Sequence, residues 1–557
     1  MSAVAEAPPS APAIGPPAPG SAAALPSAMA ALGPVPINKW LVAVSIAFGS
    51  LMATIDSSIV NVALPNIRGE LGASIQEITW ISTAYMIAMV LVMPLTGFLG
   101  GFFGQKRVYL LSMVLFVVGS ALCGTARSLP ALVAYRILQG LGGGALQPTQ
   151  QAILRQTFPP EEAGMAMALF SMVIMIGPAI GPVLGGFITD NYAWPWIFYI
   201  NLPVGIVGIL MTIKNVREPD DVRIANRARA ELARKNLDIA GIVLMVVGIG
   251  ALQYMFEEGP QDDWFDSLNI RIALFLTVFG LAGFVIRELT ATSPVVNLRL
   301  FRDRTFASAT VIAFIMFAML MGSMFLLPVF AQESLHYTAT LSGVVLMPRT
   351  LAMMAVSPFI GRIYNKIQPA FIVAFGVILF MVGSYELSGI TLETGSGDLI
   401  IPLVITGAAF ACLFVPLTTA ALSNIPRHQM ADAAGLNSFI RQVGGSVGLT
   451  IFATMFTNYA ATARAALWQH VTILRPEVVA QINGLRGGML MHGATDTSAT
   501  MMAMRSIGGR LAAQSGVLSI DRIFVLQGIL FLAVIPLLFF LRVPRTGEAV
   551  HVEISAE

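Results

Sequence analysis

The sequence predicts an all-α protein that is embedded in a membrane. Of its 557 residues, 56% are hydrophobic and 11% are charged, and the mean hydropathy is +0.78. An ordinary soluble domain has about 45–50% apolar and about 25% charged residues, so a soluble protein is excluded. Apolar runs of about 20 residues recur along the chain, and each is long enough to cross the ~30 Å hydrocarbon core as a helix. Both observations predict a polytopic helical membrane protein.

Charges, Pro/Gly turns and polar clusters separate the apolar runs into fourteen predicted transmembrane helices. The predicted spans are 39–63, 80–101, 108–126, 130–150, 165–189, 196–213, 239–256, 270–289, 306–331, 340–360, 369–389, 399–422, 436–460 and 522–542. The connection 257–263 is acidic and falls on the predicted outer side. The lysines all fall on the predicted inner side, at Lys39, Lys106, Lys214, Lys235 and Lys366. By the positive-inside rule, both termini are expected in the cytoplasm.

A weak internal repeat divides the spans into two bundles of six helices. Gly97 recurs as Gly361 at a spacing of 264 residues, and Pro148 recurs as Pro416 at a spacing of 268. Parallel repeats of this kind are typical of transporters, with the substrate site near the bilayer midplane where the halves meet.

The repeat and the composition together predict the order of domains. The order is a disordered Pro/Ala-rich cytoplasmic tail (1–37), an N-terminal six-helix bundle (38–213), a basic cytoplasmic linker (214–238), two inserted helices (239–289), a C-terminal six-helix bundle (290–542) and a cytoplasmic tail (543–557). The C-terminal bundle includes an outer, periplasmic loop (461–520). A loop of that length is functional or disordered.

Several classes of function are excluded. The 32 basic and 30 acidic residues are too balanced to indicate a nucleic-acid partner. The two cysteines, Cys123 and Cys412, lie in apolar segments of opposite halves, so no disulfide framework and no CxxC metal motif is available. No lysine follows a glycine, so the phosphate-binding loop of an ATPase is missing. We therefore expect no enzyme, no cofactor and no metal, and uphill transport would draw on an ion gradient.

Asp56 and Arg136 are charged residues inside predicted spans. A charge at the bilayer centre costs at least about 2.5–3.5 kcal/mol, so such residues are rare and usually functional. At 1.5 Å per residue, both lie roughly 9 to 11 Å below the outer boundary and can meet at one depth. The pair is either a proton-coupling switch, in which protonation of the carboxylate releases the arginine, or a static ion pair that ties two helices together.

Polar residues continue from Arg136 along the same helix face. Gln139 and Gln147 belong to this stripe, which either lines a substrate path or binds neighbouring helices. Arg349, in the tenth span, is a further charge near mid-membrane. We expect the Arg349 side chain either to bind an anionic substrate group or a coupling carboxylate, or to extend to the membrane surface.

The ninth span places Phe317, Met321 and Met324 on one face. Such polarizable side chains suit a pocket for many apolar shapes, although a Met/Phe stripe also occurs on lipid-facing or packed helices. The repeat positions of Asp56 and Arg136 in the second half fall near Leu320 and Val404, which are uncharged. Ion coupling is therefore predicted in the first half.

Five motifs follow one another between residues 39 and 542. They are Leu51-x4-Asp56-Ser-Ser-Ile-Val-Asn61-Val-Ala-Leu-Pro65, then Gly97-x-Leu99 with Gly104-x-Lys106-Arg107, then Arg136-x-x-Gln139-Gly140, then Gly177-Pro178-x-x-Gly181-Pro182-x-x-Gly185-Gly186, and Trp194-Pro-Trp196-x-Phe198-x-x-Asn201-x-Pro203. The spaced glycines and prolines of the fourth motif allow close helix approach and a bend. That suits a gate between moving bundles or static packing.

These motifs resemble those of the major facilitator superfamily, specifically its fourteen-helix drug:proton antiporters of the EmrB/QacA type. The resemblance implies two six-helix bundles in parallel repeat and export of amphipathic, toxic compounds in exchange for protons by alternating access. It assigns proton coupling to Asp56 and Arg136. One departure is that Gly101 and Phe102 stand where the family's loop motif has Asp and Arg. Lys106 or Arg107, at a helix end, would then set the conformational balance.

The EmrB-like subgroup implies a location and partners. It places the chain in the inner membrane, among lipids, as part of a three-component pump with a periplasmic adaptor and an outer-membrane channel. The loop 461–520 would be an adaptor-docking element or a lid. Alternatives are a single-component efflux pump, an exporter of a metabolite, siderophore or fatty acid, an uptake symporter, or a non-transporting receptor. The Gly-Pro motif, which marks antiporters in the family, argues against the symporter.

Overall fold

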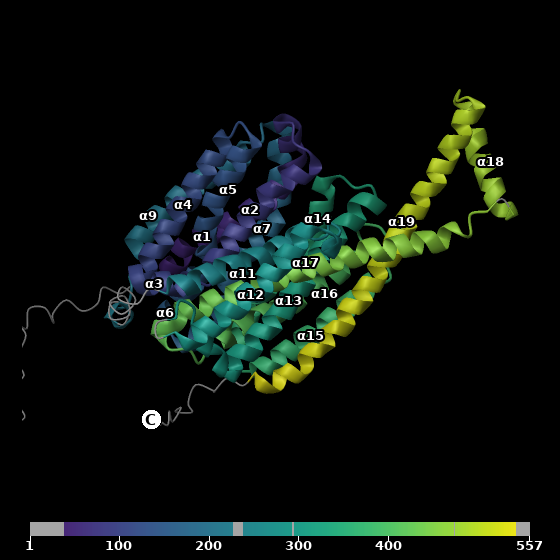
Figure 1. Cartoon of the computed structure of the whole chain (residues 1–557). Helices are drawn as coiled ribbons and strands as arrows, with labels where there is room; N and C mark the ends of the chain where they lie inside the picture. The colour runs from purple at the N-terminus through teal and green to yellow at the C-terminus, as the bar shows by residue number, and fades with distance from the viewer. Residues whose placement is uncertain (1–37, 225, 227–237, 292–293, 473, 542–557) are drawn as a thin grey trace, which may run out of the picture. The chain divides into compact units, whose positions relative to one another are not determined.

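Long helices make up most of the protein (Figure 1). The computed structural model describes residues 38–224, 226, 238–291, 294–472 and 474–541. The predicted tails 1–37 and 543–557, and most of the predicted linker 214–238, lie outside the described residues. In chain order the helices are α1 (Lys39–Leu71), α2 (Ile75–Val92), α3 (Thr96–Phe103), α4 (Gln105–Thr125), α5 (Leu129–Gly144), α6 (Leu146–Thr157), α7 (Ala163–Asn191), α8 (Trp196–Tyr199), α9 (Asn201–Asn215), α11 (Ile239–Glu258), α12 (Leu268–Thr290), α13 (Arg304–Val329), α14 (Ala339–Ile363), α15 (Pro369–Leu387), α16 (Ile400–Ala421), α17 (Met430–Trp468), α18 (Pro476–Met491) and α19 (Asp496–Phe531).

Local sequence signals set several of the helix starts. At α2, the Ser74 hydroxyl accepts from the backbone N–H of Glu77 at 3.2 Å, and the Glu77 carboxylate accepts from the backbone N–H of Ser74 at 2.9 Å. This reciprocal capping box satisfies two backbone donors that a helix start leaves free. Asp303 caps α13 and Thr338 caps α14 in the same manner, each through one side-chain oxygen.

The predicted spans are mostly helical in their described residues, but they do not all form unbroken crossings. In the described chain, twelve helices are long and apolar enough to span a membrane, and the α2–α3 pair, bent by 57°, would be a thirteenth. The remaining predicted span, 130–150, is divided at Ala145 into α5 and α6, which have 16 and 12 residues. By length and composition, the described chain therefore supports up to thirteen of the fourteen predicted crossings, and 130–150 is not among them.

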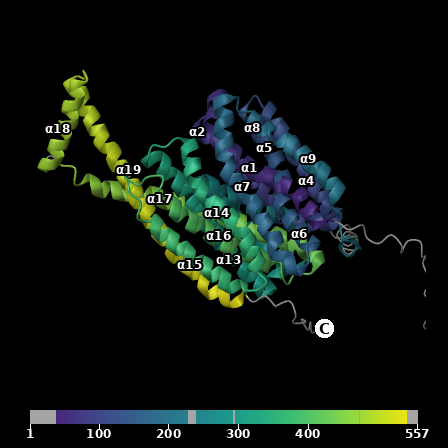
Figure 2. The same ribbon diagram turned by 180° about the vertical axis from the view of Figure 1, so that it is seen from behind.

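The outer region 461–520 is mostly helical. Helix α17 continues to Trp468, and α18 and the first part of α19 account for most of the rest. Figures 1 and 2 show α18 folded back beside α19 at one end of the bundle. We call the part of this region that follows α17, residues 469–520, the hairpin. The end of the bundle that carries the hairpin is called the hairpin end. The opposite end, where α9 leads into the linker, is the linker end.

The two halves, α1–α9 and α13–α19, pack directly along α7 and α14. Gly164 and Gly361 lie where these helices cross near the linker end, because a Cβ on Gly361 would come within 2.8 Å of the Gly164 carbonyl oxygen. Further along, the hydroxyls of Ser171 and Ser357 are hydrogen-bonded at 3.2 Å. Towards the hairpin end, Gly343 of α14 lies against Pro182 of α7.

Further hydrogen bonds join the halves at the linker end. Gln151 donates to the Ser438 hydroxyl at 3.2 Å, and Gln156 donates to the Arg427 carbonyl at 2.9 Å. Asn365 donates to the Glu161 carbonyl. The linker end is therefore held together by polar contacts as well as by close packing.

The inserted helix α11 packs between α2 and α17 on the other side of the molecule. Thr83 of α2 donates to the Glu258 carboxylate at 3.1 Å, and Gln253 donates to the Ser446 hydroxyl of α17 at 2.9 Å. Thr450 of α17 donates to the Phe256 carbonyl at 2.9 Å. The insertion thus bridges the two halves.

The α7–α14 crossing gives a first prediction. Replacing Gly361 with Val forces new methyl groups against the Gly164 backbone, so we expect a loss of about 1–3 kcal/mol in stability, as overpacking of a close contact typically costs. The midpoint of thermal unfolding in detergent measures this loss. Gly250→Val is the matched control, because a Cβ at Gly250 has open space within 4 Å. Equal midpoints for the two variants would contradict the close crossing.

Candidate functional site

Asp56 of α1 and Arg136 of α5 form a buried ion pair. The Arg136 Nη1 lies 2.6 Å from the Asp56 Oδ2, and the two side chains are 1% and 0% exposed. Taking two charges out of water costs several kcal/mol each, so such a pair persists only with good geometry and further hydrogen bonds. The two residues that the sequence placed at one depth are therefore in direct contact.

Two amides complete the surroundings of the Asp56 carboxylate. Gln139 Nε2 donates to the Asp56 Oδ1 at 2.8 Å, and Asn201 Nδ2 of α9 donates to the same oxygen at 3.0 Å. The Gln139 Oε1 in turn accepts from Arg136 Nη1 at 2.7 Å. Ser120 of α4 supports Asn201, accepting from it at 3.1 Å. The carboxylate is thus bonded by three donor residues from two helices, α5 and α9.

Helix α2 encloses the guanidinium from the other side. The Arg136 Nε donates to the Ile81 carbonyl at 3.2 Å, and the Tyr85 ring lies 4.0 Å from the guanidinium carbon. A cation over an aromatic face gains electrostatic stabilisation that increases when water is excluded. Protonation of Asp56 would remove the negative charge, weaken the hydrogen bonds that its carboxylate accepts and leave Arg136 buried without its countercharge. The site can therefore convert a proton into a change of helix contacts.

The polar stripe after Arg136 separates into two environments. Gln139 lies in the ion-pair network. Gln147, on α6, lies at the boundary between the halves, where its Oε1 accepts from the Arg441 Nη2 of α17 at 3.5 Å. Of these two glutamines, Gln147 contacts the second half, as a substrate path between the halves requires.

The candidates of the second half lie on α13 and α14, and both helices pack against α16. The Phe317 ring packs on the Phe414 ring with centroids 5.9 Å apart. Met321 and Met324, on the same helix as Phe317, are partly buried against the core. Arg349 is 4% exposed, so its guanidinium does not extend to the membrane surface, and its Nε donates to the Thr406 hydroxyl at 3.3 Å.

The glycines of the Gly-Pro motif pack α7 against α1 within the first half. Positions Gly177, Gly181 and Gly185 lie against Thr54, Ser58 and Ile59 of α1, so a side chain at any of them would collide with that helix. Gly177 therefore touches α1 two residues before Asp56. The remaining motif residues are Pro178, Pro182 and Gly186, of which Pro182 faces α14.

The loop motif joins the linker end of the first half to two other segments. Gly97 lies against Asp432 of α17, and Gly104 has φ +88°, a conformation that favours glycine. Lys106 donates to the Ile213 carbonyl at 2.8 Å, while Arg107 is exposed. In the place of the family's charged pair, Gly101 is buried, and Phe102 stacks on Phe98 and meets Phe103 edge to face.

Glu218 of the described linker lies beside this motif. Its Oε1 accepts from the Gln105 backbone N–H at 3.4 Å and from Asn226 at 2.8 Å. A linker carboxylate therefore occupies the start of α4, where negative charge is favourable.

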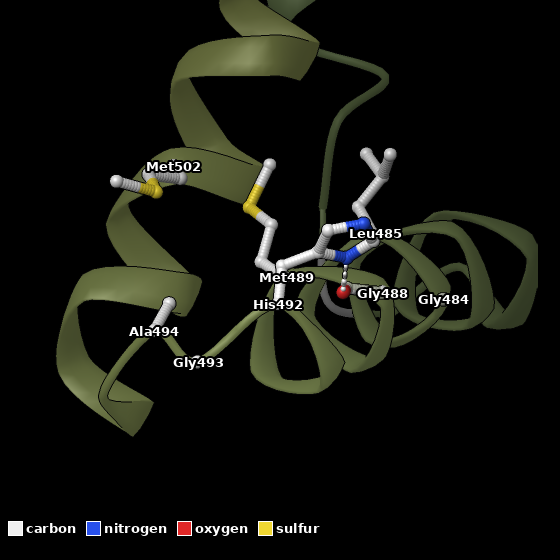
Figure 3. A pocket seen from close by; sticks show the side chains of 8 residues that line it. All are labelled: Gly484, Leu485, Gly488, Met489, His492, Gly493, Ala494 and Met502. Carbon is white, nitrogen blue, oxygen red and sulfur yellow. Dashed lines mark hydrogen bonds between the residues drawn. The ribbon is translucent and has the colours of Figure 1, made fainter.

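The hairpin carries a shallow pocket of about 650 Å³ (Figure 3). Its lining residues come from α18, the following turn and α19, and are Gly484, Leu485, Gly488, Met489, His492, Gly493, Ala494 and Met502. His492 Nδ1 donates to the Gly488 carbonyl at 2.9 Å. The lining is mostly apolar and lies far along the chain from the ion pair.

Three features of the site were not predicted from the sequence. Asn201 occurs in the fifth motif, but its motif position does not say that it faces Asp56. Tyr85 lies in an ordinary apolar stretch. Arg441 lies inside the predicted span 436–460, and a charge within an apolar span was the signal that could have found it.

The fold and the ion pair define a polytopic helical membrane protein with two related halves and a buried charge pair in the first. Residues 46–449 match the model of the Major Facilitator Superfamily. The chain belongs to this superfamily of membrane transporters, and it is not an enzyme. It is accordingly a multi-pass protein of the inner membrane.

Full-length relatives are similar to this chain. The multidrug export protein EmrB of Haemophilus influenzae is 36% identical over 506 residues, covering 90% of this chain and 96% of the relative. EmrB of Escherichia coli is 34% identical over 507 residues, covering 90% and 95%. The fatty acid resistance protein FarB of Neisseria gonorrhoeae is 32% identical over 511 residues, covering 92% and 97%. Among solved structures, the human organic anion transporter MFSD10 matches the fold with a TM-score of 0.58 at 14% identity, covering 89% of this chain and 99% of the other.

The ion pair gives a second prediction. Arg136→Gln leaves the Asp56 carboxylate buried without its countercharge, so we expect a loss of about 3–5 kcal/mol in stability. The double variant Asp56→Asn/Arg136→Gln removes both charges and should recover a large part of that loss. Thermal unfolding in detergent measures all three proteins.

Arg486→Gln is the control for loss of an arginine. It breaks the partly exposed pair with Asp496 on the hairpin, for which a change of about 0–1 kcal/mol is expected. A single Arg136 variant as stable as this control would show that the buried pair is energetically neutral.

Proposed function

We propose that the protein is a proton-coupled antiporter that exports amphipathic, toxic compounds across the inner membrane by alternating access. The single observation that carries the coupling is the Asp56 carboxylate, fully buried and held by Arg136. The names of the full-length relatives from Haemophilus influenzae and Escherichia coli support the export of drugs. In this proposal no cofactor takes part, and the proton gradient supplies the energy.

The coupling step is an exchange of partners at Asp56. A proton that reaches the carboxylate neutralises it, and Arg136 loses the charge that compensates its burial. The free energy that the pair contributed then becomes a bias toward another arrangement of α1, α5 and α9. Because Gly177 of α7 lies against Thr54 of α1, a movement of the Asp56 helix is passed to α7, whose other face packs on α14.

The described contacts support assignment of the arrangement to an outward-facing state. Hydrogen bonds such as Gln151 to Ser438 and Gln156 to Arg427 join the halves at the linker end. With the linker in the cytoplasm, as the positive-inside rule predicts, these contacts close the cytoplasmic side. Reversal requires that they break while new contacts form at the hairpin end.

The carboxylate gives a third prediction. In proteoliposomes under an imposed pH gradient, wild-type protein should release protons when a substrate from a panel of lipophilic cations, phenols and fatty acids is added. Asp56→Asn keeps the hydrogen-bonding shape but cannot ionise, so proton release should fall to the level of protein-free liposomes. Fluorescence of an internal pH dye follows the release.

The control for this experiment is Asp496→Asn, which neutralises an exposed hairpin carboxylate and should transport like wild type. If Asp56→Asn released protons on addition of substrate as wild type does, the assignment of proton coupling to Asp56 would be wrong. A non-transporting receptor would give no release with any variant, and a symporter would take up protons together with the compound.

We further propose that the hairpin docks a periplasmic adaptor that connects the protein to an outer-membrane channel. The hairpin presents the mostly apolar pocket of Figure 3 beyond the end of the bundle, and its exposed large apolar side chains include Leu474 and Met491. A patch of exposed apolar side chains is typical of a surface that binds another protein.

Docking gives a fourth prediction. Leu485→Glu places a charge in the hairpin pocket and should reduce co-purification of the cognate adaptor by about tenfold or more, as loss of an interface anchor does. Transport by the purified protein in proteoliposomes should not change, because the pocket is remote from the ion pair. Thr497→Glu adds the same charge to an exposed position outside the pocket and should retain the adaptor. Equal retention by both variants would exclude this pocket as the docking surface.

A further inference from the structure

Two arginines of the second half are buried without a counter-charge. Arg349 of α14 is 4% exposed and Arg441 of α17 is 2% exposed. Among the residues that the structure describes, neither forms an ion pair, and the Arg349 Nη2 and the Arg441 Nη1 have no hydrogen-bond partner. A buried charge is expensive unless it is paired, so each guanidinium has unused capacity for an anion.

Aromatic rings surround the Arg441 guanidinium. Its central carbon lies 4.9 Å from the centroid of Phe317 and 5.3 Å from that of Phe414. The rings stabilise the cation through their faces, but they cannot accept the hydrogen bonds of its N–H groups as a carboxylate does. The remaining contacts of this guanidinium are weak, because Gln147 and Ser438 each lie 3.5 Å from Nη2.

Arg349 of α14 lies beside another aromatic ring of α16. Its guanidinium carbon is 5.8 Å from the centroid of Phe410, which precedes Phe414 by four residues on α16. Residues four apart share one face of a helix, so the two rings form a continuous apolar strip with a guanidinium at each turn. A single elongated molecule could therefore contact both rings and one or both cations.

The depth of this strip suits a substrate site. Arg441 lies eleven residues after the start of α17, or about 17 Å along that helix. Arg349 lies ten residues after the start of α14, or about 15 Å along it. The two helices begin at opposite ends of the bundle. In a hydrocarbon core of ~30 Å both are near the midplane. Gln147 of the first half contacts Arg441, so the strip adjoins the boundary between the halves.

We propose that Arg441 and Arg349 bind the acidic head of an amphipathic organic anion, whose apolar body lies on Phe317, Phe410 and Phe414. This proposal rests on the proposed export function and names the substrate class of that path. The anion supplies the counter-charge that the chain does not, and charge-assisted hydrogen bonds to the head fix its orientation. Aromatic faces accept many apolar bodies, so selectivity resides in the charge of the head.

Binding of three probes with one decyl chain tests this assignment. The probes are decanesulfonate, which is permanently anionic, decanol, which is neutral, and decyltrimethylammonium, which is cationic. Calorimetric titration of the full chain in nanodiscs, corrected with empty nanodiscs, gives each affinity. We expect wild type to bind the sulfonate about tenfold or more tightly than the alcohol, as charge-assisted hydrogen bonds at a buried site allow.

Arginine variants locate the effect. Arg441→Gln should remove the preference for the sulfonate without weakening the alcohol, Arg349→Gln should reduce it, and Arg441→Lys should retain part of it. Arg505→Gln, which removes an exposed hairpin arginine, is the control and should bind like wild type. The lysine variant keeps the test valid if Arg441→Gln does not fold.

Two results would overturn the assignment: a sulfonate affinity no higher than that of the alcohol in wild type, or a preference that survives in Arg441→Gln. The experiments distinguish a failure of the anion site from a failure of the proposed export function. Proton release with decyltrimethylammonium but no sulfonate binding would leave the antiporter and remove the anion site. Sulfonate binding that depends on Arg441, without proton release by any probe, would leave the site and remove the antiporter.

Discussion

A carboxylate in the interior of a membrane protein must find its partners within the protein, and this constraint organises the first half. Asp56 on α1 is bonded by Arg136 and Gln139 of α5 and by Asn201 of α9. These helices are distant in the sequence, yet their rotation and depth are fixed together because each must aim one polar group at the same two oxygens. The packing of α2 over Arg136 follows from the same requirement.

The depth of a residue in the membrane could be predicted from the sequence, but the neighbouring helix that its side chain faces could not. Counting residues from the span ends placed Asp56 and Arg136 at one level, and the structure brings them together. Which face of α9 carries Asn201 toward Asp56 depends on how α9 packs on α1 and α4, and no single helix specifies this. The same limit applies to Arg441, whose aromatic surroundings come from α13 and α16.

The prediction of helix boundaries from the sequence failed where the local residue pattern and the packing of the folded protein favour different structures. The span 130–150 is apolar enough to read as one helix, but three successive glycines from Gly142 to Gly144 precede the break at Ala145. In the region 461–520, the pairing of α18 with α19 is a contact between helices that a sequence pattern does not record. The glycines of α7 were recognised as sites of close approach, but their partner helix, α1, depends on the assembled bundle.

The two seams between the halves are chemically unlike. Helices α7 and α14 meet directly through glycine and serine, whereas α2 and α17 are bridged by α11 through Thr83, Gln253 and Thr450. A molecule diffusing sideways from the lipid would meet tight backbone contact at one seam and an extra helix at the other. The inserted helix α11 therefore makes the two sides of the molecule unequal, so that a molecule in the bilayer would meet different structural elements at each seam.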